Sequence, residues 1–410
     1  MKLSIIVPVY NMASDERLAW CLNSLVNQRT MEGRPLADYE IIAVDDCSTD
    51  DSAQLLREYA ARYPGKVTAL FGDRNRHQGG AKNQGLARAR GEWIAFIDAD
   101  DWVVETYFAQ LLSKAGETGA DCVGTDYCIV HAHTMEPGPV VANSRAEQAG
   151  IVDEARRRSL LVDFGSLCVK IYRREIVYGE LDPLCGAGQS HLKPAGVSAW
   201  TAPPDVRAQE PEPAAAQPKA GPGEVRERPP ERAEGGEARW LSIFPEDIFY
   251  EDNAVVKTWV MRIGHFEYVP GPLYYYYQHE DSTVHTVSLR RLEDRLTSGR
   301  IMVREARQRG YLAPYHDEIE YSFTVLFYKN TLFGALQSLK GSSVYAFVTA
   351  IGREMKETFP DFQDNPYYQE RTNAEEKKLI AMQMASPRRF YIYYRLLWLY
   401  RRLRYGKKNG

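Results

Sequence analysis

Polar residues, most of them acidic, follow three apolar and strand-like runs near the start of the chain. The first run ends in Pro8-Val9-Tyr10-Asn11, the second in Asp45-Asp46-Cys47-Ser48-Thr49-Asp50, and a later one in Asp98-Ala99-Asp100-Asp101. Clustered carboxylates repel one another unless a cation or hydrogen-bond donors compensate their charge. Because ligands of an open α/β sheet bind beyond the carboxyl ends of its strands, we expect these residues to share a site with a divalent metal.

Asp98 and Asp100 are the expected metal ligands. Mg²⁺ and Mn²⁺ prefer oxygen ligands, and such ions usually bridge one or two carboxylates to the phosphates of a substrate. A metal there would neutralise charge that builds on a leaving diphosphate. The alternative is that Asp101 and its neighbours only cap a helix that starts near Val103, which leaves the other acidic strand ends unexplained.

Two further segments have the chemistry to bind a nucleotide. Asp45 and Asp46 directly follow an apolar run and could accept hydrogen bonds from a nucleobase or ribose. The segment His77-Gln78-Gly79-Gly80-Ala81-Lys82-Asn83 opens a helix, and a glycine-rich helix start with Lys82 nearby suits an anionic diphosphate. The alternative for this segment is a glycine-rich turn with a solvated lysine.

The elements that must position these residues follow an α/β pattern. Strands are predicted near 3–9, 40–45, 67–71, 92–97, 122–130 and 167–172. The first four alternate with helical periodicity, which predicts βαβ units and a largely parallel sheet. In the third helix Ala81, Gly85 and Ala89 recur every four residues and would allow close packing on the sheet. From about 288 onward the pattern predicts helices.

These motifs resemble, in order and spacing, the signature of family 2 glycosyltransferases with the GT-A fold. The segments that carry the resemblance are Pro8-Val9-Tyr10-Asn11, Val44-Asp45-Asp46-Cys47-Ser48-Thr49-Asp50, Gly80-Ala81-Lys82-Asn83-Gln84-Gly85, Phe96-Ile97-Asp98-Ala99-Asp100-Asp101 and, later, Phe244 to Asn253. The resemblance implies a Rossmann-like, mostly parallel mixed sheet flanked by helices, with a C-terminal helical region. It also implies transfer of a sugar, with inversion, from a nucleoside-diphosphate donor to an acceptor hydroxyl.

By that resemblance Asp46 contacts the base, most often uracil, while Asp98 lies near the ribose and Asp100 holds the metal, Mn²⁺ or Mg²⁺. The donor-binding residues are expected to be Pro8, Val9, Tyr10, Asp45, Asp46, Gly80, Lys82, Asp98, Ala99, His279 and Ser282. His279 and Ser282 are candidates because they stand in the loop after a tyrosine-rich strand, where the family often has an arginine.

The resemblance gives Asp252 the role of general base, with Glu251 beside it as the other candidate. Direct displacement needs one carboxylate to take the proton of the acceptor hydroxyl. The alternative for Glu251-Asp252 is capping of the helix that follows. Glu246-Asp247 is a second acidic pair upstream, and the sequence leaves open which pair faces the donor.

The chain of 410 residues is long enough for a catalytic core and an appended region. We predict a GT-A domain over 1–285, a helical region over 286–386 and a tail over 387–410. Within the first of these, 186–238 is rich in Pro, Ala, Glu, Arg and Gly. Such a segment buries too little surface to offset its ordering entropy, so we predict a flexible insertion, with a structured acceptor-binding lobe as the alternative.

Composition also indicates which partners and which cellular compartment the chain is expected to have. The formal net charge of -4 gives no general attraction to nucleic acid. The six cysteines form no CxxC pair, which favours a reduced, cytoplasmic setting. Met1 leads directly into a strand-like run, and no stretch of about 18 apolar residues occurs, so we expect neither a signal peptide nor a spanning helix.

The tail 387–410 is basic and aromatic and contains no acidic residue. Arg388, Arg395 and Arg402 are spaced to share one helix face, with aromatic and leucine side chains between them. An interfacial helix on an anionic membrane surface has this composition, so we expect the tail to bind the inner face of the cell membrane. The alternatives are a helix packed on the core with solvated arginines, and a contact with nucleic acid.

We therefore predict a metal-dependent glycosyltransferase whose donor is a nucleotide-sugar, with UDP as the expected nucleotide. The expected acceptor is a glycan or a lipid-linked molecule in cell-surface or exopolysaccharide synthesis. A sugar nucleotidyltransferase would need a glycine-rich loop where Tyr10-Asn11-Met12-Ala13 stands, and an NAD enzyme would need GxGxxG after the first strand. The remaining alternative is an inactive nucleotide-sugar-binding or scaffold protein of the same fold.

Overall fold

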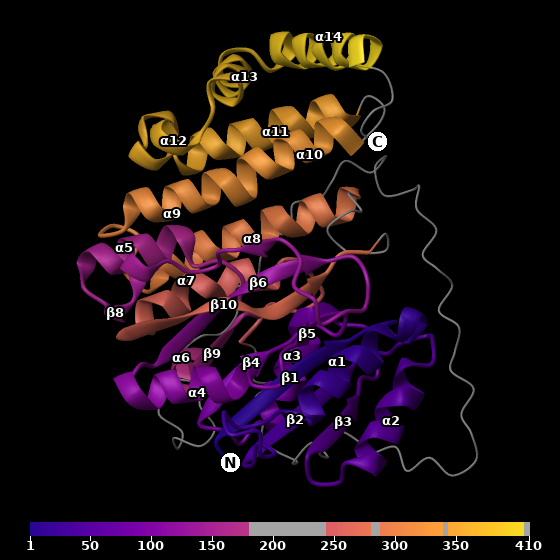
Figure 1. The fold of residues 1–410 in the computed structure, drawn as a ribbon. Helices are drawn as coiled ribbons and strands as arrows, with labels where there is room; N and C mark the ends of the chain where they lie inside the picture. The colour runs from indigo at the N-terminus through magenta and orange to yellow at the C-terminus, as the bar shows by residue number, and fades with distance from the viewer. Residues whose placement is uncertain (180–242, 280–287, 339–342, 406–410) are drawn as a thin grey trace, which may run out of the picture. The chain divides into compact units, whose positions relative to one another are not determined.

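The computed structural model describes residues 1–179, 243–279, 288–338 and 343–405. The chain divides into two compact units (Figure 1). Unit 1 contains Met1–Arg157 and Phe164–His279, and unit 2 contains Arg158–Asp163 and Glu280–Gly410. The predicted flexible insertion, 186–238, and the donor-binding candidate Ser282 lie outside the described residues.

Unit 1 is built on a ten-stranded mixed sheet with the order β3-β2-β1-β4-β9-β6-β10-β5, and β7 and β8 pair with β6 and β10. The strands are β1 (Leu3–Val9), β2 (Tyr39–Asp45), β3 (Val67–Phe71), β4 (Trp93–Phe96), β5 (Trp102–Val103), β6 (Cys122–Val130), β7 (Val140–Val141), β8 (Gly150–Ile151), β9 (Lys170–Arg173) and β10 (His265–Tyr277). The strands β3, β2, β1 and β4 run parallel, and β9 is antiparallel to both of its neighbours. The predicted strands and mixed sheet are thereby confirmed.

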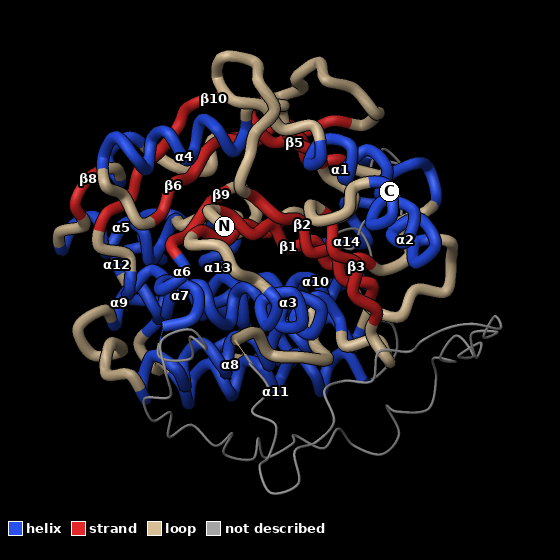
Figure 2. Tube along the Cα trace, turned by 90° about the horizontal axis from the view of Figure 1, so that it is seen from below, coloured by secondary structure: helices blue, strands red, loops and turns tan. Residues whose placement is uncertain are grey.

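Helices cover both faces of the central strands, so β1 is buried along its whole length. Figure 2 shows α3 (His77–Arg88) and α7 (Glu251–Arg262) on one face, and α1 (Arg17–Val26) and α4 (Tyr107–Thr118) on the other. Unit 1 also contains α2 (Ser52–Arg62), α6 (Arg174–Tyr178) and the first part of α5 (Glu154–Asp163). A Cβ on Gly85 would lie 2.6 Å from Cγ2 of Ile6, so α3 packs on β1 as closely as its small residues predict.

Unit 2 is helical, as the sequence predicts. It contains α8 (Leu289–Gln308), α9 (His316–Phe323), a π-helical turn (Thr324–Lys329), α10 (Asn330–Ser338), α11 (Ser343–Thr358), α12 (Pro366–Arg371), α13 (Ala374–Ala385), α14 (Pro387–Tyr405) and the last part of α5 (Glu154–Asp163). Its core is aromatic: the rings of Phe323 and Phe327 stack with centroids 4.1 Å apart. Gly299 of α8 makes room for Phe327, because a Cβ there would lie 2.9 Å from Cβ of Phe327.

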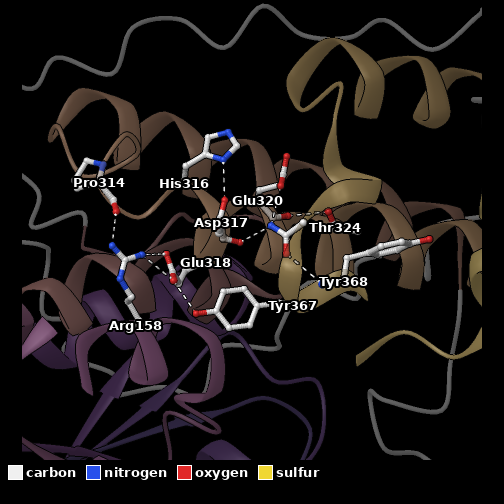
Figure 3. Close-up of polar contacts among 10 residues, drawn as sticks. Arg158, Pro314, His316, Asp317, Glu318, Glu320, Thr324, Tyr367 and Tyr368 are labelled. Carbon is white, nitrogen blue, oxygen red and sulfur yellow. Dashed lines mark hydrogen bonds and ion pairs between the residues drawn. The ribbon is translucent and has the colours of Figure 1, made fainter. Parts of the chain in front are cut away.

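Buried carboxylates on α9 are paired with donors inside unit 2 (Figure 3). Both carboxylate oxygens of Glu318 accept from Arg158 Nη1, each at 3.0 Å. Its Oε1 also accepts from the Tyr367 hydroxyl at 2.7 Å. Glu320 Oε2 accepts from Asn365 Nδ2 at 2.7 Å. These bonds join α9 to α5 and α12, so the two carboxylates contribute to the packing of the unit.

The described part of the chain has five cysteines, Cys21, Cys47, Cys122, Cys128 and Cys168, and all are free thiols. The sixth, Cys185, lies outside the described residues. Among the helices that the structure describes, none combines the length and the apolar character needed to cross a bilayer.

Candidate active site

The sheet register brings the acidic strand ends to one edge of unit 1. Val9 at the end of β1 pairs with Asp45 at the end of β2, and Ile6 pairs with Phe96 at the end of β4. Asp46 N donates to Val9 O at 2.8 Å, which extends the pairing of β1 and β2 by one residue. Since β2 and β4 flank β1, the segments that follow all three strands leave the sheet at the same edge.

Asp46 is buried and joins β2 to the segment before α3. Both of its carboxylate oxygens accept from Arg76 N, at 2.8 and 3.0 Å. Burial raises the pKa of Asp46 to about 6, and the neighbouring charge of Asp45 acts in the same direction. Asp45 accepts from Ser48 N at 3.2 Å through Oδ2, but its buried Oδ1 accepts no hydrogen bond from the described residues.

The other base-pocket candidates lie at the end of β1. Pro8 and Val9 are the last two residues of the strand and are buried with it. Tyr10 directly follows them and is 40% exposed, which leaves part of its ring open to a ligand.

Asp98 follows β4 and holds a carboxylate oxygen without a donor. Cys168 Sγ lies 3.3 Å from Asp98 Oδ2, whereas Oδ1 is buried and accepts no hydrogen bond from the described residues. Burial raises the pKa of Asp98, and the positive charge of Lys82 opposes this effect. Ala99, between the two aspartates of the Asp-x-Asp triplet, is buried.

Asp100 faces an imidazole. Its Oδ2 lies 3.2 Å from His279 Nε2, and the two side chains are 19% and 8% exposed. The sequence placed His279 among donor-binding candidates without predicting this pairing. Its other ring nitrogen, Nδ1, is buried and has no hydrogen-bond partner among the described residues.

Asp101 does not cap a helix, so that alternative from the sequence is wrong. The residues after it form the short strand β5, and α4 begins only at Tyr107. Asp101 accepts instead from the Tyr274 hydroxyl at 2.6 Å and from Tyr277 N at 2.9 Å. These bonds fix the end of β10 beside the acidic loop and thereby bring His279 to Asp100.

Lys82 is not solvated, which excludes the alternative of a solvated turn lysine. Its Nζ lies 2.6 Å from Glu251 Oε1, and the two side chains are 3% and 5% exposed. Burial alone would lower the pKa of Lys82, but the Glu251 carboxylate raises it above its ordinary value and keeps the ammonium charged. The lysine therefore neutralises one member of the Glu251-Asp252 pair directly.

The glycines at the start of α3 serve close packing. A Cβ on Gly79 would lie 2.0 Å from Pro245 O, and one on Gly80 would lie 2.3 Å from Arg76 Cβ. The helix begins at His77, so both glycines lie in its first turn. The absent side chain of Gly79 allows the segment before α7 to approach α3, which positions Lys82 against Glu251, and that of Gly80 makes room for Arg76.

Asp252 lies in the first turn of α7 and is not a cap. The cap position is Tyr250, and its side chain makes no capping hydrogen bond. Asp252 Oδ1 accepts from Asn253 N at 2.8 Å. Burial and then the charge of Glu251 raise the pKa of Asp252 to about 6, with a further contribution from Asp98. Asp252 and Asp98 are therefore electrostatic neighbours.

The upstream acidic pair is engaged elsewhere in unit 1. Asp247 forms a two-bond ion pair with Arg74, at 2.6 and 3.1 Å, and its side chain is 49% exposed. Glu246 accepts from Asn83 Nδ2 at 3.2 Å. Both contacts tie the segment before α7 to the segment around α3.

The donor set at this edge suits a hard divalent cation. Asp98 and Asp100 supply carboxylate oxygens, and His279 supplies an imidazole nitrogen. The buried Asp98 Oδ1 has no hydrogen-bond partner among the described residues, so the chemistry of this site fits such an ion, although the ligand atoms of Asp98, Asp100 and His279 do not all lie within 4.8 Å of one another.

Comparison with known proteins shows which family the N-terminal part of the chain resembles. Residues 4–179 match the sequence model of Glycosyl transferase family 2. A poly(ribitol-phosphate) beta-glucosyltransferase of Bacillus spizizenii is 44% identical over 103 residues, which are 25% of this chain and 15% of that protein. The uncharacterized glycosyltransferase YibD of Escherichia coli is 30% identical over 187 residues, or 43% of this chain and 49% of that protein. The chain thus matches less than half of the length of these two relatives.

The fold is similar to that of a solved structure, S. aureus TarS 1-349 in complex with UDP-GlcNAc. The similarity covers 95% of this chain and 89% of that one, with a TM-score of 0.55 and 18% sequence identity. The mixed sheet, its flanking helices and the C-terminal helical region are those of the GT-A glycosyltransferases. The sequence similarity to glycosyl transferase family 2 lies in residues 4–179, and the fold is that of the GT-A glycosyltransferases.

Proposed function

We propose that the chain is a metal-dependent, inverting glycosyltransferase that moves a sugar from a UDP-sugar to an acceptor hydroxyl. The observation that carries this proposal is the group of carboxylates at the ends of β2 and β4 and the start of α7. Two of them, Asp45 and Asp98, keep a buried oxygen without a hydrogen bond from the described residues. A cation and the hydroxyl groups of a nucleotide would supply the missing partners.

The donor is proposed to be a UDP-sugar because TarS, which shares the fold, was crystallised with UDP-GlcNAc and with UDP. We assign Pro8, Val9 and the exposed ring of Tyr10 to the base, with Asp45 and Asp46 as acceptors for its N–H groups or for ribose hydroxyls. The carboxylate of Asp46 is held in place for this role because both of its oxygens accept from Arg76 N.

Mn²⁺ or Mg²⁺ would be held by Asp98 and Asp100, with His279 as a further ligand. When bound, such an ion neutralises the charge that develops on the departing diphosphate. The protein's part is to hold these donors in place: Asp101 anchors β10 through Tyr274 and Tyr277, and this fixes the start of the loop that carries His279.

Asp252 is proposed to be the general base. A carboxylate oxygen of Asp252 takes the proton of the acceptor hydroxyl while that oxygen forms its bond to the anomeric carbon. The bond from the anomeric carbon to the diphosphate breaks on the opposite side, which inverts the configuration. Glu251 is paired with Lys82 and is assigned a positioning role, and this leaves Asp252 as the carboxylate available for proton transfer.

The acceptor is proposed to be a hydroxyl of a cell-surface glycan or exopolysaccharide, or of a lipid-linked precursor. Two matching relatives are named for poly(ribitol-phosphate) glycosylation, the B. spizizenii glucosyltransferase and an N-acetylglucosaminyltransferase of S. aureus. A cytoplasmic setting fits the free thiols of the five described cysteines.

The test is to measure UDP release from a set of UDP-sugars, with and without Mn²⁺ and with candidate acceptors. We expect metal-dependent release that is lost in Asp100→Asn and Asp252→Asn and kept in Asp247→Asn, a matched control in the exposed ion pair. Binding of UDP with metal but no release from any sugar would instead identify an inactive nucleotide-sugar-binding protein.

A further inference from the structure

The helix α14 is attached to unit 2 by one face. Phe390 and Tyr394 are buried on this face. The ring of Tyr394 lies 6.1 Å from that of Phe333 in α10, and the ring of Tyr391 lies 5.6 Å from that of Tyr345 in α11. One alternative for the tail is a helix packed on the core, and this face of α14 is packed in that way.

The opposite face of α14 carries an apolar stripe, which we define as Ile392, Leu396 and Leu399. These positions are spaced by four and three residues, so they lie above one another on one side of a helix. Their exposed fractions are 52%, 60% and 49%. Contiguous exposed apolar patches on a folded unit often mark a binding surface.

Cationic side chains border this stripe. Arg388 and Arg395 lie on one side of it by helical spacing, Arg389 lies on the other, and all three are exposed. Tyr393 and Tyr400, which are 38% and 51% exposed, continue the border on the side of Arg389. The described segment Pro387–Tyr405 contains no acidic residue, so no carboxylate within the helix offsets this charge.

We propose that the exposed face of α14 binds the surface of an anionic lipid bilayer, with the stripe in the acyl boundary and the bordering arginines at the lipid phosphates. An apolar centre with a cationic and aromatic rim matches the two layers of such a surface. The helix is already formed and packs on unit 2 by its inner face, so it binds without first having to fold. This proposal stands apart from the transfer reaction, since it needs only unit 2.

Two other occupants fit less well. A second copy of this chain docked symmetrically through the stripe would bring two sets of exposed arginines together, which like-charge repulsion opposes. A nucleic acid would pair with the arginines but would leave the aliphatic centre of the face without a partner, because single strands are bound on aromatic rings.

The test uses the full chain and sedimentation with phosphatidylcholine vesicles, with and without phosphatidylglycerol. We expect binding to the anionic vesicles alone. The pair Leu396→Ser and Leu399→Ser should weaken it by at least about tenfold, and each of Arg388→Gln and Arg395→Gln by about fivefold. Ile151→Ser and Arg34→Gln change an exposed aliphatic and an exposed arginine in unit 1 and serve as matched controls, with unchanged binding.

Thermal unfolding checks that each variant is folded, and the exposed positions are expected to leave the midpoint unchanged. Full vesicle binding by the Leu396→Ser and Leu399→Ser double variant would overturn the proposal. So would equal binding to neutral vesicles. Self-association that these variants abolish, or binding of single-stranded DNA in place of vesicles, would assign the face to one of the other two occupants.

Discussion

Each buried carboxylate of α9 in unit 2 meets a donor, whereas two at the strand ends of unit 1 keep a buried oxygen without one. Glu318 is held by Arg158 and Tyr367, and Glu320 by Asn365. Asp45 Oδ1 and Asp98 Oδ1 accept no hydrogen bond from the described residues. Both regions hold carboxylates, and Glu318, Glu320 and Asp45 are all buried, so the difference that matters lies in their hydrogen-bond partners.

This difference separates a structural use of carboxylates from a functional one. A buried carboxylate that lacks a donor destabilises the fold by roughly 1–3 kcal/mol or more. Such destabilisation is retained where a ligand uses the group, and it is the reason why strongly perturbed carboxylates cluster at active sites. Among the described residues, the group of three possible metal ligands whose atoms lie within 4.8 Å of one another is in unit 2 and consists of His316, Asp317 and Glu320. There Glu320 is already paired, and the other two are exposed to water.

The largest effect is expected from Asp252→Asn in unit 1. Loss of the general base should lower kcat by about 10³-fold, within the usual range of 10²–10⁴, while UDP binding stays within about twofold. The measurement is UDP release at saturating donor and acceptor, with Asp247→Asn as the control. Full activity in Asp252→Asn would move the base to Glu251 or to the upstream pair.

In unit 2 the change Glu318→Gln should lower the free energy of unfolding by about 2 kcal/mol, because it removes the charged partner of Arg158 and Tyr367. Equilibrium urea unfolding measures this, and Glu357→Gln, an exposed position on α11, should stay within about 0.5 kcal/mol. Activity per folded molecule should be unchanged. If Glu318→Gln had no effect on unfolding, the structural use of the α9 carboxylates would be refuted.

The pH dependence of turnover should report the burial of Asp252. Burial raises its pKa to about 6, so the base becomes protonated, and transfer is lost, as the pH falls through 6 rather than through the ordinary range near 4. Between about pH 7 and 5.5 we expect kcat to fall roughly fourfold. A profile that stays flat down to about pH 5 would contradict the assignment of Asp252.

The smallest effect, and one of opposite sign to that of Glu318→Gln, is expected from Asp98→Asn without metal. Removing a carboxylate whose Oδ1 lacks a donor should leave the free energy of unfolding unchanged or raise it by up to about 1 kcal/mol. Urea unfolding with and without a metal chelator measures this. A loss of more than about 1 kcal/mol would show that Asp98 stabilises the fold as Glu318 does.

Much of unit 1 follows from the sequence alone. The run Leu3–Val9 predicts a strand buried on both faces, and the acidic residues after β2 and β4 predict that the sheet gathers them at one edge. Local pattern suffices here because strand ends and helix faces are set by neighbouring residues.

The contacts that complete the site do not follow from local pattern. Lys82 and Glu251 are separated by 169 positions, and Asp100 and His279 by 179. Local sequence allows Asp101 to be a helix cap, but it binds Tyr274 and Tyr277 of β10, which only the assembled sheet brings near. Such pairings depend on tertiary packing, and the residue types alone admit several partners for each.

The most direct test of the difference between the two regions is unfolding in the presence of UDP and MnCl₂, compared with UDP alone and with MnCl₂ alone. At about one hundred times the dissociation constant, UDP with Mn²⁺ should stabilise the wild type and Glu318→Gln by the same increment of roughly 2.7 kcal/mol. Asp100→Asn should show no metal-dependent increment with UDP. If Asp100→Asn kept the full increment, or if Glu318→Gln lost it, the cation and nucleotide would not be bound at the acidic strand ends of unit 1.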